Sequence, residues 1–209
     1  ALPGGPCPQP ALSGAGMKII GRLFFIQFFC HSFDSHLTLQ TGPKKIECNL
    51  IVPFNLHALR TVVVGKKNKS VLVKPNFGRK VQADIGINTH PEAIRGVLEV
   101  LKDCGCSRIA IGESPILGVK VEKVYEESGV DRMAADYGCE LIAMDNINPV
   151  VKTIPDARLV ESTKICAPVL EYDCILSLPV AKCHMHTGVS LGIKNMKGCL
   201  WRKEKVRYH

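Results

Sequence analysis

A short stretch late in the chain concentrates side chains that could bind or transform a ligand. Residues 182–186 read Lys-Cys-His-Met-His, and Lys194 and Asn195 follow within one further segment. Ammonium and amide donors at this spacing are suited to hold a phosphate or carboxylate through charge-assisted hydrogen bonds. We therefore interpret the stretch as a site for a small anionic molecule, with Lys182 and His184 as catalytic residues and Lys194 and Asn195 as substrate-binding residues.

The two histidines leave a metal site open as an alternative. In an extended segment His184 and His186 point to the same side, because strand side chains alternate, and Cys183 then faces away. Such a pair would bind a metal if Asp145 or Glu113 supplied the further ligands that a metal site requires. A third interpretation is purely structural, with one packed and one surface histidine. The neighbouring lysines favour the anion site over both alternatives.

The elements around this stretch must place it at the end of a sheet strand. An apolar run at residues 174–178, closed by Pro179, predicts a short buried strand. After Gly188 the pattern turns helical, and we expect a helix over residues 189–197 whose N-terminal amides join the anion site. A buried strand that is followed at once by polar groups is the usual anatomy of an α/β site.

The preceding sequence alternates strand patterns with helix patterns. This order predicts an α/β fold with a mainly parallel sheet flanked by helices. Two weaker segments, 157–160 and 164–167, are expected to pair as a hairpin or to cover the sheet. The predicted strands are 61–64, 71–73, 108–111, 141–144 and 174–178, and the predicted helices begin near 91, 119, 131 and 189.

The carboxyl ends of parallel strands meet at one edge of a sheet, and ligands bind there. The predicted strand ends carry Lys74 and Asn76, then Glu113 and Ser114, then Asp145. We therefore expect Lys74 and Asn76 to join the substrate-binding residues at that edge.

Several catalytic classes lack their signatures. No G-x-G-x-x-G follows a predicted strand, which argues against a dinucleotide site, and the chain has no Walker A motif. The turn Gly-Glu-Ser-Pro-Ile at 112–116 begins like the nucleophile elbow of a serine hydrolase, but isoleucine replaces the closing glycine. We interpret it as a simple turn.

The composition is that of a basic globular protein. The chain has 209 residues, a net charge of +8 and 10 cysteines, none of which forms a C-x-x-C pair. Zinc-ribbon and ferredoxin spacings are therefore excluded, and we expect no iron–sulfur cluster on this chain. Scattered cysteines in apolar surroundings are typical of reduced thiols, which predicts a cytoplasmic protein. Few aromatic residues accompany the basic C-terminal residues, which argues against nucleic acid as a partner.

The N-terminal part has a different character. Residues 1–60 lack strong periodicity, and we expect them to be poorly ordered or to lie outside an α/β domain of residues 61–209. The apolar run 23–29 follows Lys18 and Arg22 like the start of a signal peptide, but no A-x-A-like cleavage site follows. The run is too short to span a membrane, so we expect no membrane partner.

Several motifs stand in order along the chain: K-P-N at 74–76, T-H-P-E at 89–92, I-G-E-S-P at 111–115, Asp173, L-P-V-A-K-C-H-M-H-T-G-V at 178–189 and I-K-N-M-K-G at 193–198. Together they resemble the domain of unknown function family 362 of bacteria and archaea. Members of that family usually show K-P-N, T-N-P-E, a G-D-S-P-like turn, and K-x-H followed by K-N-x-x-G. The match covers about residues 71–209, and Lys205 with His209 resembles a late lysine and histidine of the family.

The resemblance implies a domain with no established reaction and no named cofactor. This chain departs from the usual pattern with His90 in place of asparagine and Glu113 in place of the common aspartate. Many members carry ferredoxin-like cysteine repeats, so the resemblance implies a ferredoxin-like domain or redox partner, and an iron–sulfur or electron-transfer accessory role is the alternative function. The family domain normally continues past His209, which implies an incomplete domain here.

Overall fold

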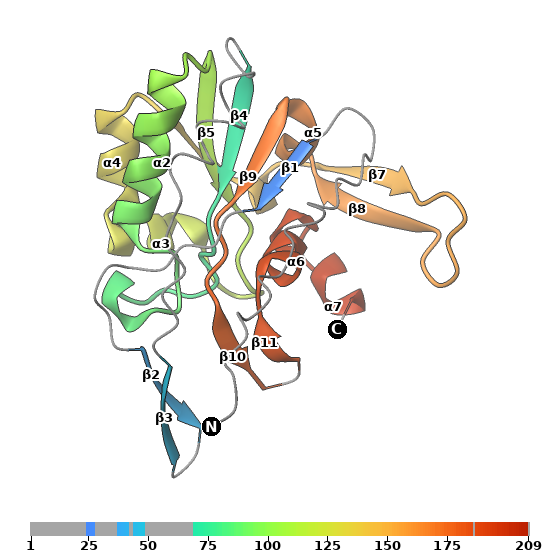
Figure 1. The fold of residues 1–209 in the computed structure, drawn as a ribbon. Coiled ribbons are helices and arrows are strands. Elements are labelled where there is room, and N and C mark those ends of the chain that lie inside the picture. The colour runs from blue at the N-terminus through green and yellow to red at the C-terminus, as the bar shows by residue number, and fades with distance from the viewer. Residues whose placement is uncertain (1–23, 28–36, 42–43, 49–68, 186, 209) are drawn as a thin grey trace, which may run out of the picture.

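A five-stranded parallel sheet forms the centre of the computed structural model, which describes residues 24–27, 37–41, 44–48, 69–185 and 187–208 (Figure 1). The strand order is β1-β9-β4-β5-β6, and every neighbouring pair is parallel. The α/β fold with a mainly parallel sheet is therefore confirmed. The strands are β1 (Phe24–Gln27), β4 (Ser70–Lys74), β5 (Arg108–Glu113), β6 (Glu140–Ala143) and β9 (Cys174–Ser177).

Helices cover one face of the sheet, and the C-terminal part of the chain covers the other (Figure 1). The first face carries α2 (Pro91–Asp103), α3 (Val121–Ser128) and α4 (Val130–Asp136). The C-terminal part contributes α5 (Pro168–Glu171), α6 (Gly192–Asn195), the 3-10 turn η3 (Met196–Cys199) directly after α6, and α7 (Glu204–Arg207). Two further 3-10 turns lie earlier in the chain, η1 (Ala83–Ile85) and η2 (Met144–Asn146).

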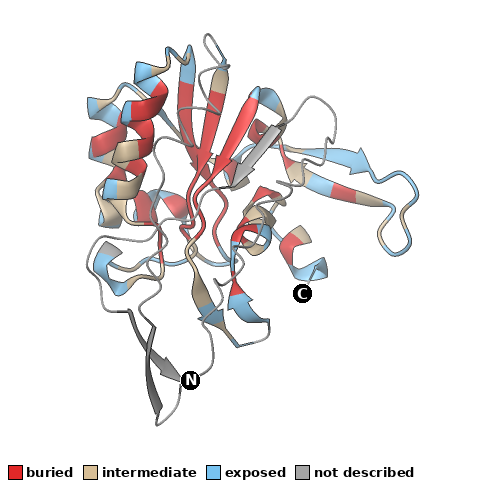
Figure 2. Ribbon diagram, viewed as in Figure 1, coloured by how far each residue is buried: buried red, intermediate tan, exposed pale blue. Residues whose placement is uncertain are grey.

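The central strands are buried on both faces (Figure 2). Val71 and Val73 pack with the helices α2, α3 and α4, whereas Leu72 between them packs in a second cluster on the opposite face. This alternation follows from the period of two along a strand. Burial on both faces explains why the parallel strands are continuous apolar runs in the sequence.

Helix α2 begins where its sequence predicts. The His90 side chain caps the helix by accepting a hydrogen bond from the Glu92 backbone N–H at 3.2 Å, and Pro91 occupies the first turn. At the other end Gly105 adopts a φ of 69°, a left-handed conformation that glycine tolerates without a Cβ clash.

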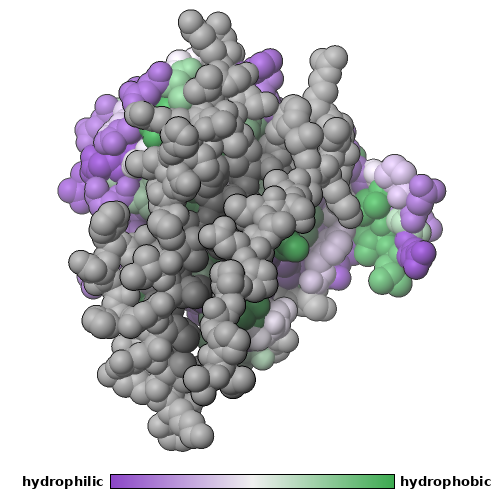
Figure 3. Space-filling model, in the orientation of Figure 1, coloured by the Kyte–Doolittle hydropathy of each residue, from purple (hydrophilic) through white to green (hydrophobic). Residues whose placement is uncertain are grey.

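The hairpin expected between residues 157–160 and 164–167 is wrong in its first strand. The structure pairs β7 (Pro149–Thr153) with β8 (Ser162–Cys166) in antiparallel register. The β-branched Val150 and Val151 favour a strand, whereas residues 155–156 form a turn. The hairpin projects from the sheet and carries exposed apolar side chains, visible at its position in Figure 3; Leu159 in its loop is 96% exposed.

The helix expected over residues 189–197 is also wrong at its start. Residues Gly188–Ser190 form β11, which pairs antiparallel with β10 (Lys182–His184), and α6 begins only at Gly192. Gly188 has a φ of 70°, so the backbone turns back there instead of starting a helix. The backbone amides of Gly188–Ser190 therefore belong to a strand and do not form a helix N-terminus.

Part of the expected organisation lies outside the described residues. This holds for the predicted strand 61–64, for His186 and for most of residues 1–60. The described parts of residues 1–60 are β1 and the antiparallel pair of β2 (Leu37–Thr41) with β3 (Lys44–Cys48). Among the helices that the structure describes, none combines the length and the apolar character needed to cross a membrane.

Candidate functional site

The order of the strands reverses between β4 and β9. From β4 the chain adds β5 and β6 on one side, and it later places β9 on the other side. Such a switch point leaves a crevice beyond the carboxyl ends of the two strands, where ligands bind in α/β sheets. Lys74 and Ser177, which end these strands, are register partners, and a cavity of about 640 Å³ has Lys74 in its wall.

Basic side chains dominate the wall of this strand-end cavity. Of the residues that the structure describes, six lysine and arginine side chains and a single carboxylate, that of Glu113, line it. Two of the lysines form ion pairs, Lys74 with Glu113 and Lys205 with Asp145. Within the described part of the chain no carboxylate forms an ion pair with the other four. The six basic residues are Lys74, Arg79, Lys182, Lys194, Lys197 and Lys205.

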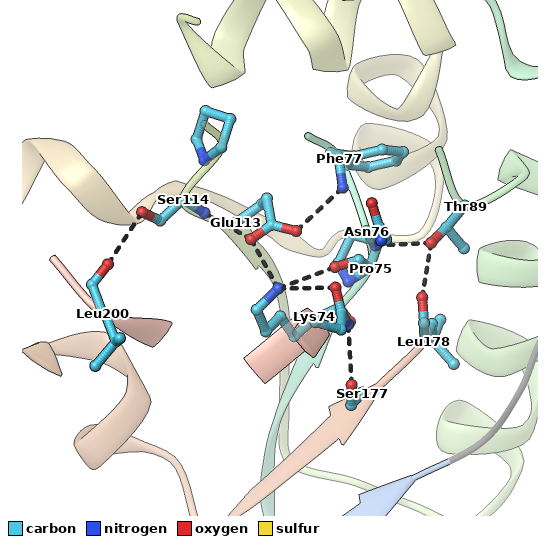
Figure 4. Close-up of polar contacts among 12 residues, drawn as sticks. Lys74, Pro75, Asn76, Phe77, Thr89, Glu113, Ser114, Ser177, Leu178 and Leu200 are labelled. Atoms are coloured by element: carbon cyan, nitrogen blue, oxygen red, sulfur yellow. Dashed lines mark hydrogen bonds and ion pairs between the residues drawn. The ribbon is translucent and has the colours of Figure 1, made fainter. Parts of the chain in front are cut away.

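A buried ion pair lies at the base of the cavity (Figure 4). Lys74 is fully buried, and its Nζ donates to Glu113 Oε1 at 2.7 Å, to the Pro75 carbonyl at 3.1 Å and to Asn195 Oδ1 at 3.3 Å. Glu113 also accepts the backbone N–H groups of Ser114 and Phe77. Because all three protons of the ammonium have acceptors, Lys74 fixes the geometry of the site and its charge is largely neutralised.

Asn195 ties the C-terminal segment to the two strand ends. Its side-chain NH₂ donates to Ser177 Oγ at 2.9 Å and to the Lys74 carbonyl at 3.4 Å. It therefore positions Lys74, and the cavity wall that α6 provides, against β4 and β9.

Asn76 and Lys182 meet on the other side of the cavity. Asn76 donates its backbone N–H to Thr89 Oγ1 at 2.7 Å, and Thr89 donates in turn to the Leu178 carbonyl at 2.7 Å (Figure 4). Lys182 Nζ donates to Asn76 Oδ1 at 3.1 Å and to the Ile87 carbonyl at 2.7 Å. The structure thus brings together four residues from distant parts of the sequence, Lys74, Asn76, Lys182 and Asn195. This agrees with the expectation that the carboxyl ends of parallel strands meet at one edge of the sheet.

The free ammonium form of Lys182 is disfavoured by its surroundings. Burial is the main cause that lowers its pKa to about 8; Arg79, Lys194 and Lys74 lower it further, and Glu113 partly offsets them. Burial also lowers the pKa of Lys194, and that of Lys197 with a contribution from Lys194. An anion among these cations would stabilise their charged forms.

His184 lines the cavity from β10. Lys182 and His184 are half-buried and Cys183 between them is exposed, so the expected alternation holds along this strand. Asp145 lies beside Ser114 and Lys205. Among the described residues no group of three His, Cys, Asp or Glu side chains could hold a metal ion, and the proposed partner His186 is outside them.

A second polar cluster lies at the cavity, and the sequence predicted the strand-end positions of Ser114 and Asp145 but not their contacts with each other and with Lys205. Ser114 Oγ donates to Asp145 Oδ1 at 2.5 Å and accepts a hydrogen bond from Lys205 Nζ. Lys205 also donates to the Pro115 carbonyl at 2.8 Å. In the sequence Lys205 stands in a basic C-terminal stretch, and its resemblance to the late lysine of the family is the one signal that singles it out.

Gly198 is a further residue that the sequence did not mark as structural. A Cβ at this position would come within 2.6 Å of Lys74 Nζ and 2.8 Å of Lys74 Cε, and it would overlap Glu113 Oε1. The absence of a side chain therefore lets η3 approach the buried ion pair.

Comparisons with known proteins agree with the motif resemblance. A family model described as "Domain of unknown function (DUF362)" matches residues 71–209. The chain is similar to the "Thylakoid-associated protein sll1697" of Synechocystis sp. (strain ATCC 27184 / PCC 6803 / Kazusa), with 26% identity over 149 residues, which is 69% of this chain and 43% of that protein. The chain thus spans less than half the length of this curated relative. No solved structure matches.

Proposed function

The chain belongs to the family described as domain of unknown function (DUF362), and from this premise we propose that it binds a small anionic metabolite in the strand-end cavity and acts on it as an enzyme. The observation that carries the proposal is the imbalance of charge: among the described residues that line the cavity, four of the six basic side chains have no carboxylate partner, because only Lys74 and Lys205 form ion pairs. Cavities lined by one sign of charge concentrate ligands of the opposite sign.

The roles divide by burial and hydrogen bonding. Lys182 and His184 are half-buried on β10 and face the substrate as the catalytic residues, and Lys194 binds its anionic group. Lys74, Asn76 and Asn195 are buried and bonded to the protein, so they position the others. A phosphate or a carboxylate fits this arrangement, since ammonium groups bind both through charge-assisted hydrogen bonds.

Replacing Lys182 tests the proposal directly. A charge-assisted hydrogen bond contributes about 1.5–3 kcal/mol, so Lys182→Met should weaken anion binding roughly 10- to 150-fold. His184→Ala should weaken it less. Isothermal titration with inorganic phosphate and with citrate measures both variants beside the wild type.

The matched control is Lys123→Met on α3, which removes a lysine that is exposed, paired with Glu126 and outside the cavity wall. Its affinity for phosphate should equal that of the wild type. Unchanged binding by Lys182→Met would place the anion elsewhere, and unfolding of Lys182→Met but not of Lys123→Met would assign Lys182 a structural role.

Anion binding should also depend on pH through Lys182. Its pKa of about 8 means that the ammonium is present below that pH and is lost as the pH rises through it. If binding requires the ammonium, the affinity falls with rising pH, approaching about a tenfold loss for each pH unit above the pKa. Sulfate is the suitable probe because its own charge is constant over this range, and titration calorimetry below and above pH 8 gives the profile.

Lys182→Arg is the control for that profile. A guanidinium stays charged at these pH values, so the variant should bind sulfate with a flatter pH dependence. A wild-type profile that is itself flat would show that Lys182 does not contact the anion.

A further inference from the structure

The end of β5 carries a serine hydroxyl between a carboxylate and an ammonium. Ser114 is buried, lines the strand-end cavity, and donates to Asp145 Oδ1 at 2.5 Å while accepting from Lys205 Nζ. The three residues come from the loop directly after β5, from η2 and from α7, so only the fold assembles them.

Asp145 is held so that it can accept the serine proton. Its Oδ1 also accepts the Arg202 backbone N–H at 3.1 Å, and its Oδ2 lies 3.2 Å from Lys205 Nζ. An aspartate that accepts the proton of an attacking hydroxyl is a recurring part of phosphoryl-transfer sites. The Lys205 ammonium in turn stabilises the negative charge that develops on the serine oxygen.

The surroundings favour a phosphoryl group over an acyl group as the target. Acyl transfer requires backbone or side-chain donors for an oxyanion. The Ser114 backbone N–H instead donates to Glu113 Oε1 at 2.8 Å and is therefore occupied. The charge of a transferring phosphoryl group spreads over three oxygens, which suits a wall that carries Lys182, Lys194 and Lys197.

We propose that Ser114 is a nucleophile that accepts a phosphoryl group from a phosphate ester bound in the strand-end cavity, an inference that rests on the proposed anion-binding function. Ser114 Oγ attacks phosphorus and forms a new O–P bond as its proton passes to Asp145. The ester O–P bond breaks, its electron pair leaves with the alcohol oxygen, and solvent protonates that oxygen. Water then attacks phosphorus and forms a new O–P bond while the Ser114 O–P bond breaks. The Ser114 oxygen takes its proton back from Asp145, and the phosphate leaves with the protons of the attacking water, of which solvent accepts any excess.

Incubation of the full chain with p-nitrophenyl phosphate tests this step. Release of p-nitrophenolate is followed by absorbance, and phosphoserine is located by peptide mass spectrometry after an acid quench. The wild type should carry phosphate on Ser114. Ser114→Ala should lose both signals, and Asp145→Asn should slow the reaction about 10²- to 10⁴-fold.

The matched control is Ser190→Ala, since Ser190 is also buried and also borders the cavity. It should react like the wild type. Titration with inorganic phosphate is measured for every variant, and Ser114→Ala should still bind it, which shows that the cavity is intact.

The outcomes separate this inference from the proposed function. If phosphate binds but no phosphoserine forms on the wild type, the nucleophile is disproved and the anion site stands. If phosphate does not bind and no phosphoserine forms, both proposals fail. Labelling of Ser114 by p-nitrophenyl acetate but not by the phosphate ester would overturn phosphoryl transfer in favour of acyl transfer.

Discussion

Glu113→Gln is expected to destabilise the folded protein by about 3–5 kcal/mol, because it leaves the buried Lys74 ammonium without its counter-charge. The side chains of Lys74 and Glu113 are 1% and 4% exposed, so water cannot compensate the lost partner. The substitution keeps the size of the side chain, and the effect therefore reports on charge. Urea unfolding followed by the fluorescence of Trp201, the chain's single tryptophan, measures the change.

The control is Glu92→Gln, the same replacement in an exposed ion pair with Arg95 on α2. Exposed pairs contribute about 0–1 kcal/mol, so this variant should unfold almost like the wild type. The double variant Lys74→Met/Glu113→Gln removes both charges and should recover part of the stability lost in Glu113→Gln. Equal, small losses in Glu113→Gln and Glu92→Gln would refute the central role of the buried pair.

Gly198→Ala is expected to cost at least about 1–3 kcal/mol, the usual penalty for overpacking a core. The new methyl group would overlap Glu113 Oε1 and lie within 2.6 Å of Lys74 Nζ, so the ion pair or η3 must shift. The same shift should weaken phosphate binding, because Lys197 lies within η3, Asn195 directly precedes it, and both line the cavity. Urea unfolding and phosphate titration measure the two effects.

Gly96→Ala serves as the matched glycine control. Gly96 lies inside α2, and a Cβ there would meet nothing within 4 Å. The substitution should stabilise the helix by up to about 1 kcal/mol, since alanine has the higher helix propensity. Opposite signs for the two glycine variants are the expected result. A Gly198→Ala protein that is as stable as Gly96→Ala would show that η3 adapts freely.

Local patterns in the sequence carried enough information for strands β4, β5, β6 and β9 and for the first helix, α2, but not for β1, whose apolar run resembles the start of a signal peptide. The apolar runs that became β4, β5 and β9 are buried on both faces, so their composition alone distinguishes them from loops. The cap at His90 and the proline at 91 act within a few residues, and the start of α2 follows from them.

The failures arose where pairing across the chain overrode a local pattern. Residues 189–197 have a helical spacing, but the pairing of Gly188–Ser190 with Lys182–His184 satisfies the backbone as a hairpin. The partner of β8 was likewise misplaced, because short strands are selected by the register they form with a neighbour and not by their own propensity.

The sequence by itself determined the α/β fold, the family, and the edge of the sheet where polar side chains gather, because parallel strands deliver their carboxyl ends to one edge. Only the tertiary structure decided how those side chains pair. It buried Lys74 against Glu113, left Lys182 half-buried at the cavity, and set Ser114 between Asp145 and Lys205. The physical reason is that burial and hydrogen-bond geometry depend on distances between residues far apart in the chain, and these distances exist only once the segments have packed together.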